Sequence, residues 1–221
     1  ERHVIVGLKA AKAQGYTPVS IGIDTWAVDF VLLDQDGRRL CDAVAYRDSR
    51  TAGMDAELEK TLSFKDHFAL CGIAKQPFNT VYQLYADLQA GRLERASDAL
   101  MLPCWLMYKL CGVKAREYTN ATTMGMVNAQ TGEFDEEIIA SLGYPNHLFP
   151  KLSQPGTVMG EYEGIKCVLC ATHDTGSAVE GIPMEGDHLY ISSGTWSLLG
   201  VKTPKPITDA GSEAANYSNE G

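Results

Sequence analysis

The chain has 221 residues, of which 45% are hydrophobic and 21% charged, so it can bury a sizeable core and is not globally disordered. Its net charge of −9 argues against a nucleic-acid partner, because such proteins need a basic face that neutralises phosphates. No apolar run approaches the roughly 20 residues of a membrane span, and the start lacks the pattern of a signal peptide. We therefore expect a cytoplasmic protein with neither nucleic-acid nor membrane partners.

The six cysteines do not form the pattern of a disulfide scaffold. Cys167 and Cys170 have the spacing of half a zinc site, but no second pair of this kind occurs. In a strand this spacing also sends the two side chains to opposite faces. We expect both cysteines to be small apolar residues of a buried strand.

The first half of the chain predicts a helix, a strand pair and then more helices. Helical spacing covers residues 4–15, and residues 20–33 are rich in β-formers. The turn pair Asp36 and Gly37 predicts a hairpin whose return strand covers residues 39–46. Helical signals dominate residues 51–110.

Caps and turn residues mark the later elements. The predicted elements are helices over residues 80–91, 103–112, 135–143 and 174–179, a strand over 166–171, and a hairpin over 188–200. This order is typical of an α/β protein with mixed sheets, not of a bundle or a sandwich. Both ends look cut short, since no cap precedes the first helix and the last residues are poor in apolar side chains.

The stretch HDTGSAV, residues 173–179, lies where a strand gives way to a helix. Ligands of open α/β sheets bind at such strand ends, and the helix start adds exposed N–H groups. There Asp174 would accept a proton from a hydroxyl or hold a metal-bound water. A second interpretation stays open, in which Asp174 or Thr175 is an ordinary N-cap and His173 is a core imidazole bonded to backbone.

The stretch SSGTWS, residues 192–197, places hydroxyls and a glycine in a tight turn between two predicted strands. Backbone N–H groups in such a turn can form an anion nest that suits a nucleotide phosphate. The alternative is a turn whose hydroxyls bond to their own backbone. The chain has no P-loop and no GxGxxG motif, so any phosphate binding would use β-hairpins.

A third stretch, IGIDTWAVDF, carries Asp24 and Asp29 inside an otherwise apolar strand region. Buried carboxylates are costly unless they are paired or used. Trp26 and the small Ala27 would shape a sugar pocket, with the aromatic face against C–H groups. In the alternative, Asp29 faces solvent and Trp26 packs in the core.

Several motifs together resemble those of the FGGY carbohydrate kinases, and they run along almost the whole chain. Each motif alone is weak, but their common order is specific. Within the family the likeness is to members that phosphorylate L-rhamnulose, which carry glycine at the position of Ala27. The motifs are SIGIDTWAVDFVLLDQDG, VAYRDSRT, QPFNTVYQL, REYTNATT, THDTGSAV, LYISSGTWSLLG and AANYSNEG.

This resemblance implies an α/β fold of the two-lobed actin-like, ribonuclease-H-like kind, with a mixed sheet and the active site in the cleft. It implies ATP and Mg²⁺ as cofactors, and transfer of the γ-phosphoryl group to the primary hydroxyl of L-rhamnulose, giving L-rhamnulose 1-phosphate. Asp174 would then be the general base and would also help to hold Mg²⁺. His173 and Thr175 would flank the sugar, and the backbone of Ala27 would form the opposite wall. Thr195 would contact a nucleotide phosphate.

The same resemblance divides the chain into two parts. Residues 1–185 correspond to the sugar-binding lobe, incomplete at its start, and residues 186–221 to the beginning of the nucleotide-binding lobe. The family's first phosphate motif and its adenosine pocket lie outside these residues. We therefore expect this chain alone not to turn over ATP at a useful rate.

Two other functions stay open from the sequence. One is a kinase for another ketose or polyol, such as L-fuculose or xylulose, although IDTWAVDF and YRDSRT favour L-rhamnulose. The other is a catalytically silent sugar-binding module.

Overall fold

The computed structural model describes residues 1–186, 188–194 and 196–221. Its helices are α1 (Arg2–Ala13), α2 (Met54–Leu58), α3 (Phe64–Cys71), α4 (Thr80–Gln89), α5 (Leu102–Cys111), α6 (Tyr118–Thr122), α7 (Glu136–Ser141), α8 (Asp174–Glu180) and α9 (Ala210–Ala214), with short 3-10 turns η1 (Ser49–Thr51), η2 (Leu93–Arg95) and η3 (Asn146–Leu148). Its strands are β1 (Ser20–Ile21), β2 (Phe30–Leu33), β3 (Asp98–Met101), β4 (Val158–Tyr162), β5 (Ile165–Val168), β6 (Leu189–Ser193) and β7 (Ser197–Val201).

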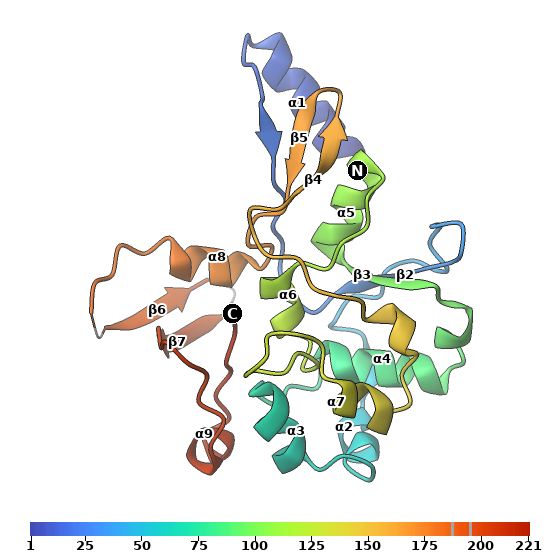
Figure 1. The fold of residues 1–221 in the computed structure, drawn as a ribbon, viewed down its shortest axis with the longest axis vertical. Coiled ribbons are helices and arrows are strands. Elements are labelled where there is room, and N and C mark those ends of the chain that lie inside the picture. The colour runs from blue at the N-terminus through green and yellow to red at the C-terminus, as the bar shows by residue number, and fades with distance from the viewer. Residues whose placement is uncertain (187, 195) are drawn as a thin grey trace.

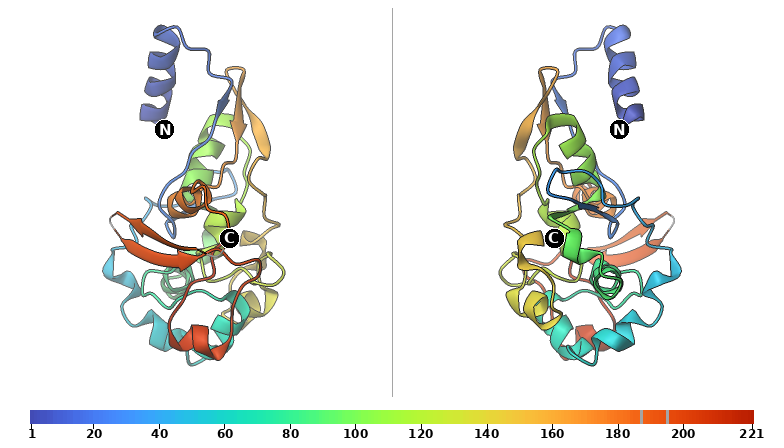
Figure 2. Two further views of the ribbon diagram at one scale, coloured as in Figure 1. Left: turned by 90° about the vertical axis from the view of Figure 1, so that its left-hand side faces the viewer. Right: turned by 90° about the vertical axis from the view of Figure 1, so that its right-hand side faces the viewer.

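These elements form three small sheets among helices. One sheet has the order β1-β5-β4, with β1 parallel and β4 antiparallel to β5, so the sheet is mixed as predicted. The other two are the antiparallel pairs β2–β3 and β6–β7. Figures 1 and 2 show α1 with β4 and β5 at one end of the molecule and the helical body of α2, α3, α4 and α7 at the other. The β6–β7 hairpin projects to one side.

Most predicted elements are confirmed, including α1, α4, α5, α7, α8 and the β6–β7 hairpin. The caps explain several of their ends. The Asp135 carboxylate accepts the Ile138 N–H at 2.9 Å at the start of α7, and Gly112 ends α5 with a φ of 73°. Among the described residues, no helix has the length and apolarity that a membrane crossing requires.

The prediction that residues 39–46 form the strand paired with residues 20–33 is wrong. The turn does form, and the Leu40 N–H donates to the Leu32 carbonyl at 2.9 Å, but the strand paired with β2 is β3. All four residues of β2 are buried, so β2 needs an apolar neighbour, and β3 supplies one while residues 39–46 are largely exposed. The predicted run of helices over residues 51–110 therefore contains a strand.

The predicted β region of residues 20–33 is also interrupted. It splits into β1 and β2 because Val28 adopts a φ of 67° and turns the chain sharply. The predicted strand over 166–171 ends earlier, at Val168. Cys167 is fully buried in it as predicted, whereas Cys170 lies beyond its end and is half-buried.

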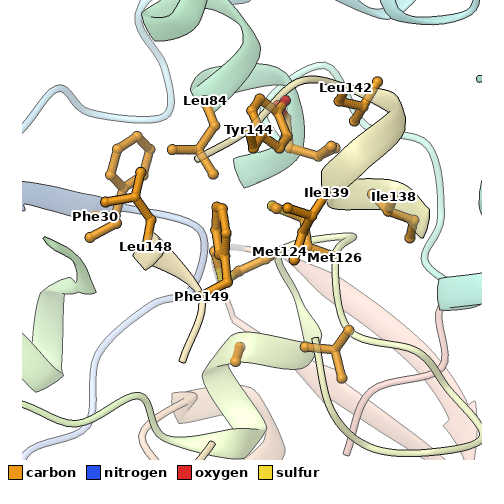
Figure 3. Packing of buried hydrophobic residues seen from close by; sticks show 14 of the residues in the cluster. Phe30, Leu84, Met124, Met126, Ile138, Ile139, Leu142, Tyr144, Leu148 and Phe149 are labelled. Carbon is orange, nitrogen blue, oxygen red and sulfur yellow. The ribbon is translucent and has the colours of Figure 1, made fainter. Parts of the chain in front are cut away.

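The main hydrophobic core lies in the helical body beneath β2 (Figure 3). Leu84 of α4, Ile138 of α7 and Leu148 of η3 are fully buried there, and each such side chain contributes roughly 1.5–3 kcal/mol. The Tyr144 hydroxyl donates to the Val81 carbonyl at 2.6 Å inside this core. The core therefore anchors β2 and the segment that leads into it.

The last residues fold back over the helical body. The Asn219 backbone N–H donates to the Gly72 carbonyl at 2.8 Å, and the Asn219 side chain donates to the same oxygen at 2.9 Å. The Ala74 N–H donates to the Ser218 hydroxyl at 3.1 Å. This return path carries Glu220 toward the start of α8.

Candidate functional site

Two segments that are distant in the sequence meet beside the start of α8. Thr25 forms an isolated parallel bridge with His173. The Thr25 N–H donates to the Thr172 carbonyl at 3.0 Å, and the Asp174 N–H donates to the Thr25 carbonyl at 2.9 Å. The predicted site residues His173, Asp174 and Thr175 thus lie against the segment that contains Ala27.

Asp174 is the first residue of α8, and its side chain is 53% exposed. Its Oδ1 accepts the Thr175 N–H at 2.7 Å. The N-cap position belongs to His173, which makes no capping bond through its side chain. The interpretation of Asp174 or Thr175 as the N-cap is therefore wrong, and the Asp174 carboxylate is accessible for chemistry.

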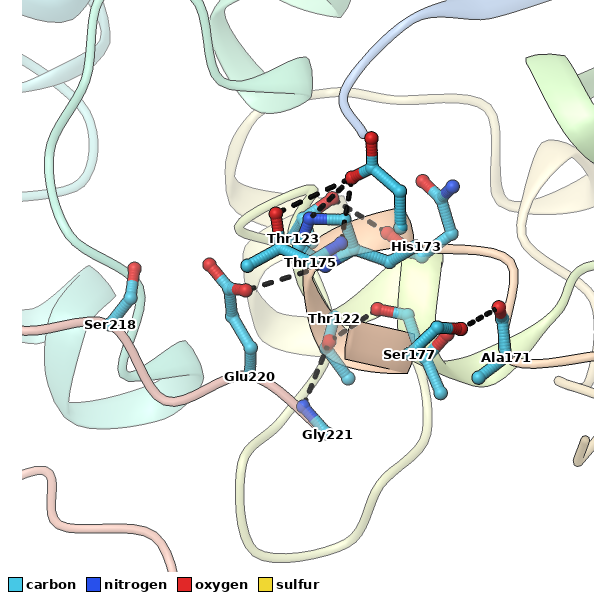
Figure 4. Close-up of polar contacts among 12 residues, drawn as sticks. Thr122, Thr123, Ala171, His173, Thr175, Ser177, Ser218, Glu220 and Gly221 are labelled. Atoms are coloured by element: carbon cyan, nitrogen blue, oxygen red, sulfur yellow. Dashed lines mark hydrogen bonds and ion pairs between the residues drawn. The ribbon is translucent and has the colours of Figure 1, made fainter. Parts of the chain in front are cut away.

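His173 is buried, and a carboxylate lies near each of its two ring nitrogens; Figure 4 shows Glu220 beside it. Its Nδ1 lies 3.4 Å from Oε2 of Glu220, and its Nε2 lies 3.9 Å from Oδ1 of Asp174. Burial raises the pKa of Glu220, while the nearby His173 ring lowers it. Within the described part of the chain Nδ1 has no hydrogen-bond partner. The alternative interpretation, in which backbone groups satisfy the imidazole, therefore fails at this atom.

A buried carboxylate that the sequence did not single out holds the residue before His173. Glu117 is fully buried and caps α6, accepting the N–H groups of Thr119 at 2.8 Å and Asn120 at 3.1 Å. It also accepts from Thr172, at 3.1 Å from the N–H and 2.6 Å from the hydroxyl. The Asn120 amide donates to the Thr172 carbonyl at 3.2 Å. Glu117 and Asn120 thereby position the segment between β5 and α8 that leads to Asp174.

On the opposite segment, Trp26 and Asp29 form a hydrogen-bonded pair. The Trp26 Nε1–H donates to Oδ2 of Asp29 at 2.9 Å, with the ring 49% exposed and Asp29 only 5% exposed. Burial raises the pKa of Asp29, and the hydrogen bond from Trp26, the nearby Tyr46 backbone and the charge of Arg50 offset this in part. The interpretation that placed Asp29 in solvent and Trp26 in the core is therefore wrong.

Val28 between them has a strained backbone. Its φ of 67° is rare for a β-branched residue, and the Asp29 N–H closes a tight turn onto the Ala27 carbonyl at 2.9 Å. The Val28 carbonyl accepts the Thr80 hydroxyl at 2.8 Å and the Gln83 amide at 3.0 Å. The first turn of α4 therefore holds the backbone of Ala27 and Val28 in place.

Arg50 links α4 to the same region. Its Nη2 donates to Oε1 of Gln83 at 2.7 Å, and its Nε lies 3.9 Å from Oδ1 of Asp87. Its guanidinium carbon lies 5.8 Å from the centre of the Phe30 ring. Arg50 thus contacts Gln83, one of the two residues that hold the Val28 carbonyl.

The hydroxyl-rich turn lies at the tip of the β6–β7 hairpin. Ser193 Oγ and Ser197 Oγ are 3.3 Å apart across it. Thr195, the predicted nucleotide-phosphate contact, lies outside the described residues. The Trp196 ring packs 5.7 Å from the ring of Phe78, which brings the hairpin next to the segment that begins α4.

The start of α8 offers one accessible carboxylate to a metal ion. Within the described ranges, no group of three or more His, Cys, Asp and Glu side chains is arranged to hold a metal. Asp174 offers one accessible carboxylate, and Mg²⁺ is commonly bound by one or two carboxylates with waters and substrate phosphates. Asp174 is thus the residue of this site that suits Mg²⁺.

Comparison with known proteins gives a family match and close relatives. The model of the N-terminal domain of the FGGY family of carbohydrate kinases matches residues 7–171. A rhamnulokinase of Oceanobacillus iheyensis is 44% identical over 231 residues, which cover 100% of this chain and 49% of that protein. A rhamnulokinase of Yersinia pestis is 41% identical and is covered to 47%. The chain spans about half the length of these curated relatives.

Solved structures of low identity share the fold. A xylulose kinase from Lactobacillus acidophilus superposes with a TM-score of 0.79 at 17% identity, over 90% of this chain and 44% of that one. A xylulose kinase from Rhodospirillum rubrum gives a TM-score of 0.71 at 18% identity, over 80% and 39%. The α/β, actin-like fold expected from the sequence is confirmed.

Proposed function

The chain belongs to the FGGY family of carbohydrate kinases, and from this we propose that it forms the sugar-handling part of an ATP-dependent kinase for L-rhamnulose. The product would be L-rhamnulose 1-phosphate. Residues 1–185 would be the sugar-binding lobe and residues 186–221 the beginning of the nucleotide-binding lobe. We place the reaction in the cytoplasm.

One observation carries the proposal: the accessible Asp174 carboxylate lies beside the Thr25–Ala27 segment. The bond from the Asp174 N–H to the Thr25 carbonyl fixes this neighbourhood at 2.9 Å. Phosphoryl transfer asks mainly for positioning and charge neutralisation, with one base near the attacking hydroxyl. A half-exposed carboxylate at the start of α8 meets the last requirement.

The residues of this chain would divide the work. Asp174 takes the proton of the sugar's primary hydroxyl as that oxygen attacks. His173 and Thr175 flank the sugar, and the Ala27 backbone, held by the strained Val28 turn, forms the opposite wall. When bound, ATP supplies the transferred phosphoryl group and Mg²⁺ neutralises phosphate charge, with Asp174 and Thr195 as the contacts we propose.

The choice of L-rhamnulose rests on the relatives. The proteins that are 41–44% identical to this chain are named rhamnulokinases, whereas the xylulose kinases share its fold at 17–18% identity. Pocket residues set sugar specificity, so the higher identity favours the first group. The alternative substrates L-fuculose and xylulose are the natural competitors in an assay.

A coupled assay of the full-length protein with ATP and Mg²⁺ tests the proposal. We expect turnover with L-rhamnulose well above that with L-fuculose or xylulose, and ³¹P NMR should show a phosphomonoester on C1. Preferred turnover of a competitor would reassign the substrate. Sugar binding without any Mg²⁺-dependent ATP binding in calorimetry would identify a silent sugar-binding module and overturn the proposal.

A further inference from the structure

The half-exposed ring of Trp26 is held by a scaffold that is itself buried. The Trp26 indole donates to Asp29 at 2.9 Å, and Asp29 is among the most buried acidic residues of the described chain. One oxygen of that carboxylate, Oδ1, has no hydrogen-bond partner within the described residues. A buried carboxylate that is only partly paired is costly, so an arrangement that keeps one usually serves a site.

The backbone beside the ring is also strained. Val28 is held at a φ of 67° by bonds from Thr80 and Gln83 to its carbonyl. Strained backbone of this kind persists only where the surroundings enforce it, and it clusters at ligand sites. Strain and a buried charge therefore coincide at the point where Trp26 is presented to solvent.

The bridge between Thr25 and His173 places the segment that carries Trp26 beside the carboxylate that we propose as the base. The Asp174 N–H donates to the Thr25 carbonyl at 2.9 Å, so Trp26 and Asp174 each lie one residue beyond the bridge on adjacent segments. Trp26 is 49% exposed and the Asp174 side chain 53% exposed, whereas His173 is buried.

From this juxtaposition we propose that Trp26 recognises the methyl group of a 6-deoxyketose, and that it makes the site selective for this class of sugar. The inference rests on the proposed function and deepens it. In L-rhamnulose carbons 1 to 5 all carry oxygen, and only C6 is a bare methyl. With the C1 hydroxyl at Asp174, the methyl is the part of the sugar that gains most from an apolar aromatic face.

Two substrates that differ only at C6 test the proposal in the full-length protein: L-rhamnulose, and L-fructose, which carries a hydroxyl at C6. Trp26→Ala should lower kcat/KM for L-rhamnulose by about 10- to 200-fold, the range for one methyl in an apolar pocket, and change that for L-fructose far less. Trp26→Phe keeps an apolar ring and should retain part of the preference. Trp105→Phe, a tryptophan under Arg39 and remote from this bridge, is the matched control and should leave the ratio unchanged.

A binding measurement covers the case in which Trp26→Ala does not fold. Addition of L-rhamnulose without ATP should change the indole fluorescence of the full-length wild type and of Trp105→Phe, and the change should be much smaller in Trp26→Phe. An unchanged substrate ratio in Trp26→Ala, or a fluorescence change in Trp26→Phe as large as in the wild type, would overturn the inference while the kinase activity stands. A wild type that phosphorylates no L-rhamnulose would instead refute the proposed function, and this inference with it.

Discussion

The helical body beneath β2 and the β6–β7 hairpin differ sharply in how their apolar side chains are covered. Leu84 and Leu148 in the body are fully buried, whereas Ile191 and Leu199 on the hairpin are 70% and 60% exposed. The body therefore has a core of its own, while the hairpin is a two-stranded pair of the kind that is marginal in isolation. The Ala27 backbone, which we propose as one wall of the sugar site, adjoins Val28, whose carbonyl is held by Thr80 and Gln83 of the body.

The largest loss of stability is expected from a substitution in the helical body. Leu84→Ala should lower the free energy of unfolding by about 2–5 kcal/mol, because it removes a fully buried side chain from the core. Urea unfolding followed by circular dichroism measures this. A loss below about 1 kcal/mol would mean that the body lacks the tight packing described.

A substitution of Glu117 tests whether its hydrogen bonds to Thr172 position the candidate site. Glu117→Gln should cost about 1–3 kcal/mol, because it weakens charge-assisted bonds to Thr172 and to the start of α6. It should also lower kcat more than it changes sugar affinity, since Asp174 would be less well positioned. The matched control is Glu137→Gln, on the exposed side of α7, and an equally small effect of both changes would remove Glu117 from this role.

A smaller effect, visible in the pH dependence, is expected at Asp29. Burial raises its pKa, so the folded state binds this proton more tightly than the unfolded state does. The stability from this group is complete below the unfolded-state pKa and is lost as the pH rises through the folded-state pKa.

Above about pH 4, the wild type should therefore lose stability relative to Asp29→Asn. Urea unfolding of both proteins over a pH series measures the difference. Asp42→Asn, at an exposed carboxyl, is the control. A difference between wild type and Asp29→Asn that is constant with pH would contradict the account.

Substitutions on the β6–β7 hairpin should change the free energy of unfolding least. Leu199→Ala and Ile191→Ala should each change the free energy of unfolding by no more than about 0.5 kcal/mol, as expected for exposed side chains. The same urea series serves for this test. Losses as large as that of Leu84→Ala would show that the hairpin shares the core of the body and would remove the contrast.

Local signals predicted the elements whose ends are set by neighbouring residues. The Asp135 cap marked α7, Gly112 marked the end of α5, and Asp174 marked the start of α8, although β5 ends earlier than predicted, at Val168. These features depend on residues a few positions apart, which periodicity and capping rules can detect.

Long-range pairing and backbone strain could not be predicted from such local signals. The partner of β2 is β3, which lies inside a region of helical signals, and Glu117 bonds to Thr172 across 55 positions. Neither contact leaves a local pattern. A β-branched residue such as Val28 disfavours a positive φ. This conformation is explained only by the hydrogen bonds that Thr80 and Gln83 donate to the Val28 carbonyl in the folded chain.

The central claim, that Asp174 is the general base, is tested most directly by Asp174→Asn in the full-length protein. The account predicts a fall in kcat of about 10²- to 10⁴-fold with L-rhamnulose affinity within a few-fold of the wild type, because the amide keeps the shape of the side chain but accepts no proton. A variant that keeps near wild-type kcat would contradict the account.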